Sequence, residues 1–151
     1  MAIAVEVKSR HRPGVLGFPG DADELKLLQG DVRTLLSAAV AKAPGDSPFM
    51  IFIDLNSPLT PALPIDQKPW FADLLRSADH VIGANNPESP DEFNAIFVTN
   101  FSFHYQTDRE ADPVEHVYVI PKYVAHPLPD SRLLELITSG LDSYGNVPRL
   151  E

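Results

Sequence analysis

Glu6 and Lys8 stand two residues apart in an apolar segment near the start of the chain. In a β-strand, side chains two residues apart lie on the same face, so this spacing would place a carboxylate beside an ammonium group. Hydrolysis of a phosphodiester with Mg²⁺ needs oxygen ligands for the metal and a cation near the attacking water or the leaving group. Glu6 would supply a ligand, Lys8 the cation, and the carbonyl group of Val7 a further ligand.

The same spacing also has a simpler explanation, because Glu-x-Lys occurs by chance in many sequences and commonly forms a surface ion pair. The neighbouring residues favour the chemical interpretation. Residues 1–13 hold Lys8, Arg10 and Arg12 against the single acid Glu6, whereas the whole chain has a net charge of −9. An anionic substrate such as nucleic acid would therefore approach residues 8–12, and Arg10 and Arg12 would contact its phosphate backbone.

The composition indicates one globular domain spanning residues 1–151, with the open alternative that it is the C-terminal part of a longer nuclease-like chain. The absence of cysteine excludes disulfides and thiolate metal sites. No apolar run is long enough to cross a bilayer, so we expect no membrane partner and a cytoplasmic location. The negative net charge argues against a protein that coats nucleic acid non-specifically.

The pattern of apolar residues predicts an α/β fold with a mixed sheet of about four strands flanked by helices. A strand–helix–strand unit usually makes a right-handed parallel crossover, and the second strand is apolar enough to be covered on both faces. The predicted strands are 2–9, 49–56, 95–105 and 116–123, and the predicted helices are 22–42, about 69–78, and a last helix that begins at Asp130 or Ser131 and ends near Gly140.

The order of the first elements resembles the second half of the restriction-endonuclease-like, or PD-(D/E)xK, nuclease core. In that family a strand with [D/E]-x-K precedes a core helix and a further core strand, and "VEVKSR", "ELKLLQGDVRTLL" and "FMIFIDL" match these in turn. The resemblance implies a restriction-endonuclease-like partial core in which Glu6 binds Mg²⁺ or Mn²⁺, Lys8 positions or activates water, and Gln29 lies near the site. Residues after about 56 have no counterpart in that core.

The second acidic ligand is an open question. The family carries it on the strand before the motif, and residues 1–5 contain no acid, although two carboxylates are close to a minimum for holding Mg²⁺. Three explanations remain: a longer chain, a relocated acid such as Asp21, Glu24 or Asp54, or an inactive site. Asp54 follows the buried strand, at the end where ligands collect in parallel α/β sheets, but a turn-forming role also explains it.

A non-catalytic interaction or adaptor domain is the alternative from another class. The acidic remainder of the chain, the proline-rich stretch 57–69 and the aromatic residues of 95–105 suit a surface for a protein partner or a second copy of the chain. Lys68, Pro69 and Trp70 are expected to form a semi-exposed cluster without an assigned role. The histidines lack the close spacing typical of a zinc site.

Overall fold

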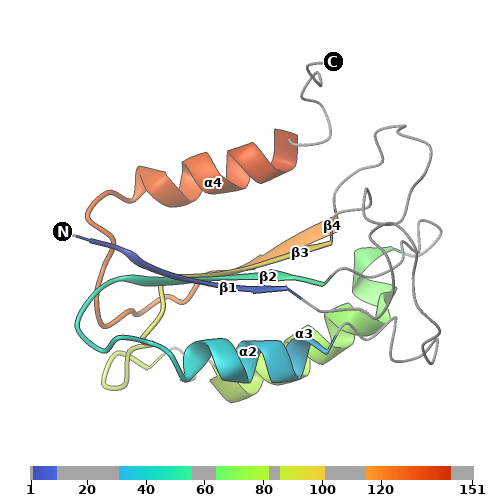
Figure 1. Cartoon of the computed structure of the whole chain (residues 1–151), viewed down its shortest axis with the longest axis horizontal. Coiled ribbons are helices and arrows are strands. Elements are labelled where there is room, and N and C mark those ends of the chain that lie inside the picture. Colours follow the sequence, from blue (N-terminus) through green and yellow to red (C-terminus); the bar gives the residue numbers. More distant parts are fainter. Residues whose placement is uncertain (1, 10–30, 56–63, 82–85, 101–114, 144–151) are drawn as a thin grey trace.

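The computed structural model is a four-stranded sheet between two layers of helices (Figure 1). It describes residues 2–9, 31–55, 64–81, 86–100 and 115–143. The strands are β1 (Ala4–Ser9), β2 (Phe49–Asp54), β3 (Ala95–Asn100) and β4 (Glu115–Val119). The helices are α2 (Val32–Val40), α3 (Pro69–Val81) and α4 (Arg132–Ser143), with a 3₁₀ turn at Ile65–Gln67. The predicted α/β class with a mixed sheet is confirmed.

The sheet has the strand order β1-β2-β3-β4, in which β1, β2 and β3 are parallel and β4 runs antiparallel to β3. Helix α2 lies between β1 and β2 in the chain, and α3 between β2 and β3. The crossovers β1–α2–β2 and β2–α3–β3 move in the same direction across the sheet. Because both crossovers have the same handedness, both helices lie on one face. Helix α4 covers the other face (Figure 1). None of the helices within the described ranges is long and apolar enough to cross a membrane.

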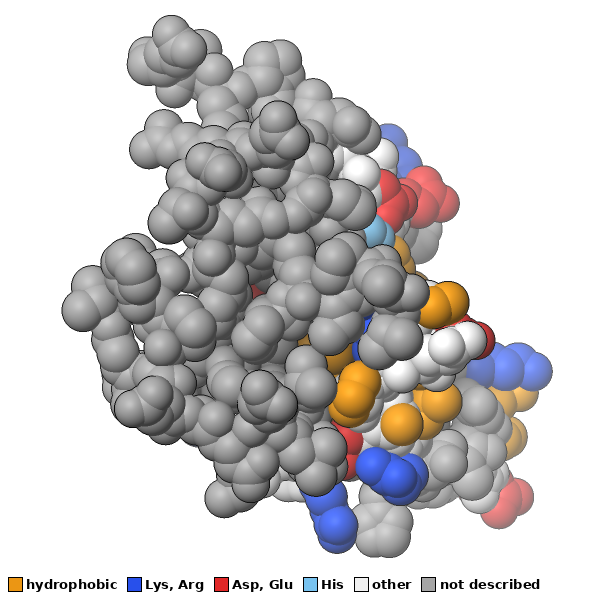
Figure 2. All heavy atoms as spheres, turned by 90° about the vertical axis from the view of Figure 1, so that its right-hand side faces the viewer, with side chains coloured by type: hydrophobic (Ala, Val, Ile, Leu, Met, Phe, Trp, Pro, Cys, Tyr) orange, Lys and Arg blue, Asp and Glu red, His pale blue; other side chains and the backbone are white. Residues whose placement is uncertain are grey.

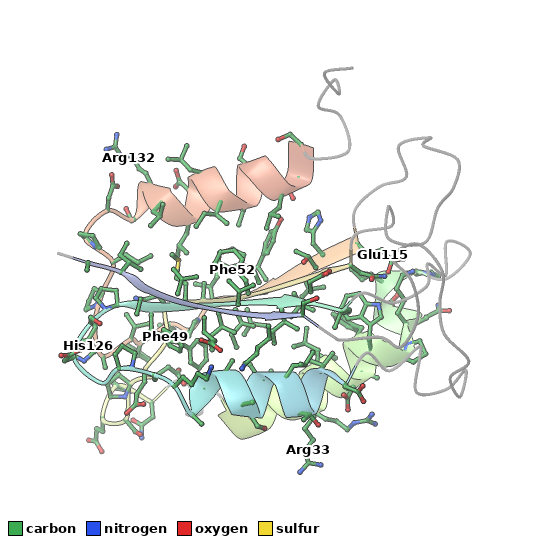
Figure 3. The ribbon with its side chains drawn as sticks, viewed as in Figure 1. Arg33, Phe49, Phe52, Glu115, His126 and Arg132 are labelled. Carbon is green, nitrogen blue, oxygen red and sulfur yellow. The ribbon has the colours of Figure 1, made fainter. Side chains whose placement is uncertain are left out.

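Strand β2 is covered on both faces of the sheet, which explains why its sequence is a continuous apolar run. Phe49 belongs to the core under α2 and α3, whereas Phe52 packs in the core under α4, and their rings point to opposite sides of the sheet (Figure 3). On α2, the buried residues Val32, Leu36 and Ala39 follow helical spacing. This stripe fixes the face that α2 turns toward the sheet.

Some predicted boundaries are wrong. Helix α4 continues through Gly140 to Ser143, and Gly140 does not have the positive φ of a glycine that ends a helix. Strand β4 ends at Val119, two residues before Pro121, which has no N–H group to donate to a ladder. Residues 22–30 of the first predicted helix and residues 101–105 of the third predicted strand lie outside the described residues.

The expected semi-exposed cluster at Lys68 is also wrong, because Lys68 and Trp70 are both buried. The Lys68 ammonium group forms an ion pair with Glu115 at the start of β4. The other oxygen of that carboxylate accepts a hydrogen bond from Asn100 Nδ2 at 3.1 Å. A buried charge is tolerated only when it is paired and hydrogen-bonded, so this contact fixes the segment before α3 against the β3–β4 edge.

Removing one partner of this buried pair should therefore destabilise the fold. We expect Lys68→Met to lower the free energy of unfolding by about 3 kcal/mol, because it leaves the Glu115 carboxylate buried without its counter-charge. The double variant Lys68→Met/Glu115→Gln should regain part of this loss. Urea unfolding measures both, with the exposed Lys122→Met as control. A loss from Lys68→Met no larger than that of the control would contradict the assignment.

Candidate functional site

The Glu6 cluster, which consists of Glu6, Lys8 and Lys42, lies where β1 faces α2. Strand alternation turns Ala4, Glu6 and Lys8 to this side, and Ala4 packs against the core there. The Glu6 Oε1 atom lies 2.9 Å from Lys8 Nζ and 2.7 Å from Lys42 Nζ. Lys42 follows the C-terminal end of α2. The predicted pairing of Glu6 with Lys8 on one face is thus present, with a second lysine that sequence reasoning missed.

The two lysines set the charge state of the cluster. Hydrogen bonding from Lys42, and then from Lys8, holds the pKa of Glu6 below its ordinary value. The same contact with Glu6 raises the pKa of Lys42. The side chain of Glu6 is 19% exposed and that of Lys42 is 57% exposed. A cation that approached Glu6 would compete with Lys42, which has room to move away into solvent.

Within the described strands, the sheet register brings no second acid beside Glu6. Glu6 pairs with Ile51 and Lys8 pairs with Ile53 on β2. Asp54 instead pairs with Ser9, one step further along β1, and therefore lies on the opposite face of the sheet. Its carboxylate accepts a hydrogen bond from Ser9 Oγ at 3.4 Å. Among the described residues, no group of three or more histidines and acids could hold a metal ion.

The other predicted site residues are only partly covered by the structure. Arg10, Arg12, Asp21, Glu24 and Gln29 lie outside the described residues. Figure 2 shows the side of the molecule at which β1, β2 and β3 end, and its described part mixes acidic, basic and hydrophobic side chains. The described part of this side is therefore not a uniformly basic surface.

The carbonyl group of Val7 lies on the side of β1 at which no described strand pairs. The amide of Ala4 donates a hydrogen bond to Pro48 O at 2.9 Å, which directs the main-chain groups of Ala4 toward β2. In a parallel pair these groups alternate in direction along the strand. The main-chain groups of Val5 and Val7 therefore point away from β2. The Val7 carbonyl thus points along the sheet rather than toward α2.

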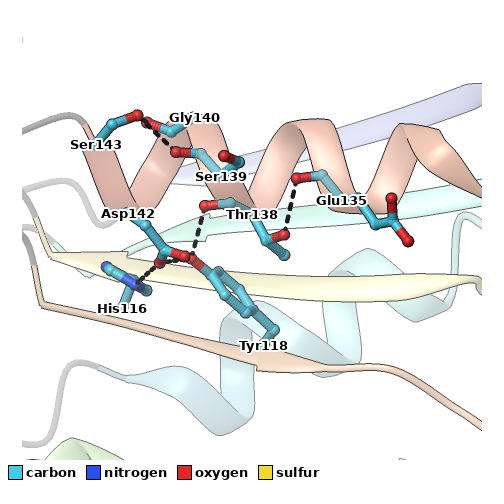
Figure 4. A network of polar contacts seen from close by, with 8 residues as sticks. All are labelled: His116, Tyr118, Glu135, Thr138, Ser139, Gly140, Asp142 and Ser143. Carbon is cyan, nitrogen blue, oxygen red and sulfur yellow. Dashed lines mark hydrogen bonds and ion pairs between the residues drawn. The ribbon is translucent and has the colours of Figure 1, made fainter.

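A second polar cluster, which sequence reasoning missed, joins α4 to β4 (Figure 4). The Asp142 Oδ1 atom lies 2.7 Å from His116 Nε2 and accepts a hydrogen bond from the Tyr118 hydroxyl at 2.8 Å. Strand alternation would have placed His116 and Tyr118 on one face. Nothing in the sequence identifies Asp142 as their partner, because it lies 26 and 24 residues away.

The electrostatics of this second cluster indicate an anchor for α4. Hydrogen bonds from Tyr118, and then from His116, lower the pKa of Asp142. Burial, and then the bond to Asp142, raises the pKa of the Tyr118 phenol. The phenol therefore stays protonated and donates a hydrogen bond to the carboxylate. The last turn of α4 is held to β4 by these two bonds.

No family model, curated protein or solved structure matches this chain. The PD-(D/E)xK resemblance therefore remains a resemblance of motif and element order. Functional inference rests on the geometry of the described residues.

The lowered pKa of Glu6 should depend on Lys42. We expect Lys42→Ala to raise the pKa of Glu6 toward the ordinary glutamate value, because the first of its two ammonium partners is lost. Carbon-13 NMR of the side-chain carboxyl groups measures this pKa directly. Lys122→Ala, which replaces an exposed lysine elsewhere, should leave it unchanged. An unchanged Glu6 pKa in Lys42→Ala would disprove the contact.

The anchor of α4 should make stability depend on pH in a defined direction. A carboxyl group whose pKa is lower in the folded state stabilises the fold above its unfolded pKa, and this contribution is lost as pH falls through the folded pKa. We expect Asp142→Asn to lower the Tm at about pH 7 and to have a smaller effect at about pH 2.5, because the stabilisation declines once the pH is below the ordinary aspartate pKa. The exposed Asp46→Asn is the control. An equal loss at both pH values would show that the charge on Asp142 contributes nothing.

Proposed function

We propose that the chain is a metal-dependent nuclease domain of PD-(D/E)xK type, which hydrolyses phosphodiester bonds of DNA or RNA at the Glu6 cluster. The observation that carries this proposal is the contact of 2.9 Å between Glu6 and Lys8 on one face of β1. It sets a carboxylate for a metal beside an ammonium group for the water or the phosphate. The order of β1, α2 and the parallel strand β2 supports it further.

The residues of the cluster have distinct roles in this proposal. Glu6 is ionised at neutral pH, as an ordinary glutamate would be, and its lowered pKa keeps the carboxylate ionised further into the acid range. An ionised carboxylate is the ligand that Mg²⁺ or Mn²⁺ prefers. When bound, the metal polarises the phosphoryl group and activates water. Lys8 holds the attacking water or a phosphate oxygen. Lys42 neutralises Glu6 and would move away from it if a metal were bound, and Arg10 and Arg12 bind the phosphate backbone.

In this proposal Glu6 is one carboxylate of the metal site. On β2, Glu6 pairs with Ile51 and Lys8 pairs with Ile53, so β2 adds no carboxylate beside it. Asp54 is left out of the proposed site, since it lies on the other face of the sheet. The proposal therefore assigns the second carboxylate to Asp21 or Glu24.

A non-catalytic interaction domain is the second candidate, and one observation favours it. Glu6 already has two ammonium partners, at 2.7 and 2.9 Å. An ion pair of this kind holds α2 to β1 without any metal. Either function is compatible with a cytoplasmic location, which remains our expectation.

A cleavage assay separates the two candidates. The chain is incubated with Mg²⁺ or Mn²⁺ and end-labelled single- and double-stranded DNA and RNA, next to Glu6→Gln and Lys8→Ala. We expect cleavage by the wild type and a loss on the order of 100-fold or more in both variants. Glu135→Gln and Lys122→Ala are matched controls, because both residues are exposed and lie outside β1 and α2, and they should cleave normally.

The same assay identifies the missing acid and the role of Lys42. Either Asp21→Asn or Glu24→Gln should abolish cleavage, and Lys42→Ala should lower the metal concentration that is required. Equal cleavage by the wild type and Glu6→Gln would overturn the nuclease proposal. The nuclease proposal would also be overturned if no folded variant cleaved any substrate with either metal. That result would favour the interaction domain.

A further inference from the structure

Strand β1 is an edge of the sheet that the described strands form, and it carries exposed apolar side chains. Among the four strands, only β1 has large hydrophobic residues that are exposed, namely Val5 at 49% and Val7 at 66%. Both lie on the face opposite to the Glu6 cluster. Val7 pairs with Phe52, so it continues a row that runs through the core under α4. The edge is therefore apolar next to the partly buried aromatic side chain of Phe52.

The main-chain N–H and C=O groups of this edge are also positioned to pair with another strand. Strand β1 has β2 as its partner, and no described strand lies on its other side. The N–H and C=O groups of Val5 and Val7 point outward, as derived above. Natural edge strands are usually blocked by proline, by a bulge or by charged side chains that point outward. The β1 segment has no proline, and its charged residues Glu6 and Lys8 face α2 and are paired with each other.

We propose that β1 is a dimer interface, at which two copies of the chain pair antiparallel about a twofold axis at Val7. In this register Val7 of one copy lies opposite Val7 of the other and exchanges two main-chain hydrogen bonds with it. Glu6 then lies opposite Lys8 of the other copy, twice, and such opposite-charge cross-strand pairs are stabilising. The segment is thus complementary to itself.

Electrostatics select this register over its neighbours. Pairing needs outward-pointing residues opposite one another, so the register can change only in steps that move the axis to Glu6 or to Lys8. An axis at Glu6 places two carboxylates opposite each other, and an axis at Lys8 places two ammonium groups opposite each other. Like charges in direct opposition are destabilising. Only the axis at Val7 pairs opposite charges.

The helix layer is continued by the same pairing. Helix α2 packs against both β1 and β2, so its axis lies about half a strand spacing inside β1. With strands about 4.8 Å apart, the two α2 helices would lie roughly 10 Å apart across the axis, which is a usual helix-packing distance. Their contact adds the buried area that two six-residue strands alone would not supply. The product is a continuous sheet built from two four-stranded sheets.

Cysteine cross-linking tests the register, because the chain contains no cysteine of its own. Directly opposed residues in a hydrogen-bonded antiparallel pair have Cα atoms about 5.5 Å apart, within the range that a disulfide spans. We expect Val7→Cys to form a disulfide-linked dimer under mild oxidation. Val5→Cys is the matched control, since two copies of residue 5 would lie about 14 Å apart. It should cross-link at least tenfold more slowly.

The oligomeric state gives an independent readout. Light scattering after size exclusion should show a dimer for the wild type and for Leu136→Lys, which charges an equally exposed residue on α4. Val7→Lys should be a folded monomer, because two ammonium groups would meet at the axis. A monomeric wild type, or equal cross-linking of Val5→Cys and Val7→Cys, would overturn the proposal. This result is independent of cleavage, so either proposal can fail alone.

Discussion

The parallel register between β1 and β2 determines what each candidate residue can reach. Glu6 and Lys8 pair with the buried residues Ile51 and Ile53, and therefore face α2. A slip of one residue would exchange the two faces of β1, which would bury Val7 under α2 and turn Glu6 toward α4. The core under α4 resists this slip, because Glu6 and Lys8 would then lie beside the apolar row of Phe52 and Phe97. The same register separates Asp54 from Glu6 and leaves valines on the free edge.

The ion pairs of the molecule differ in how readily a partner can leave. Lys68 is buried against Glu115, and separating the two would strand a charge in the core, which is costly. At the Glu6 cluster the partner is the half-exposed Lys42, and exchange of such a surface ion pair costs little. Of these two arrangements, only the Glu6 cluster lets another cation replace a lysine at the carboxylate. This difference distinguishes a candidate site from a structural contact.

Sequence periodicity was sufficient to predict the elements but not their neighbours. The apolar run of β2 and the helical spacing of α2 gave their type and approximate position, since both are properties of a local segment. The contact of Lys68 with Glu115 joins residues 47 positions apart, and Asp142 meets His116 across a helix and a strand. Such pairs depend on register and on which face a helix covers. Those quantities are decided by the whole core, and no local pattern encodes them.

The same limit explains the outcome for the candidate site. Alternation along one strand was enough to place Glu6 beside Lys8, because both residues belong to a single element. Asp54 was considered as a ligand from its position at a strand end. Its face depends on the one-residue step between Lys8 and Ser9 in the pairing with β2, which the sequence does not reveal. Lys42 was missed because its approach to Glu6 requires the packing of α2 on β1.

The nuclease proposal requires that Glu6, on the α2 face of β1, binds a divalent cation. Electron paramagnetic resonance of free Mn²⁺ measures this binding directly, without a substrate. The wild type should bind Mn²⁺, Glu6→Gln should bind it at least roughly tenfold more weakly, and Asp54→Asn should bind like the wild type because Asp54 lies on the opposite face. Binding that survives in Glu6→Gln but is lost in Asp54→Asn, or no binding by the wild type, would contradict the claim.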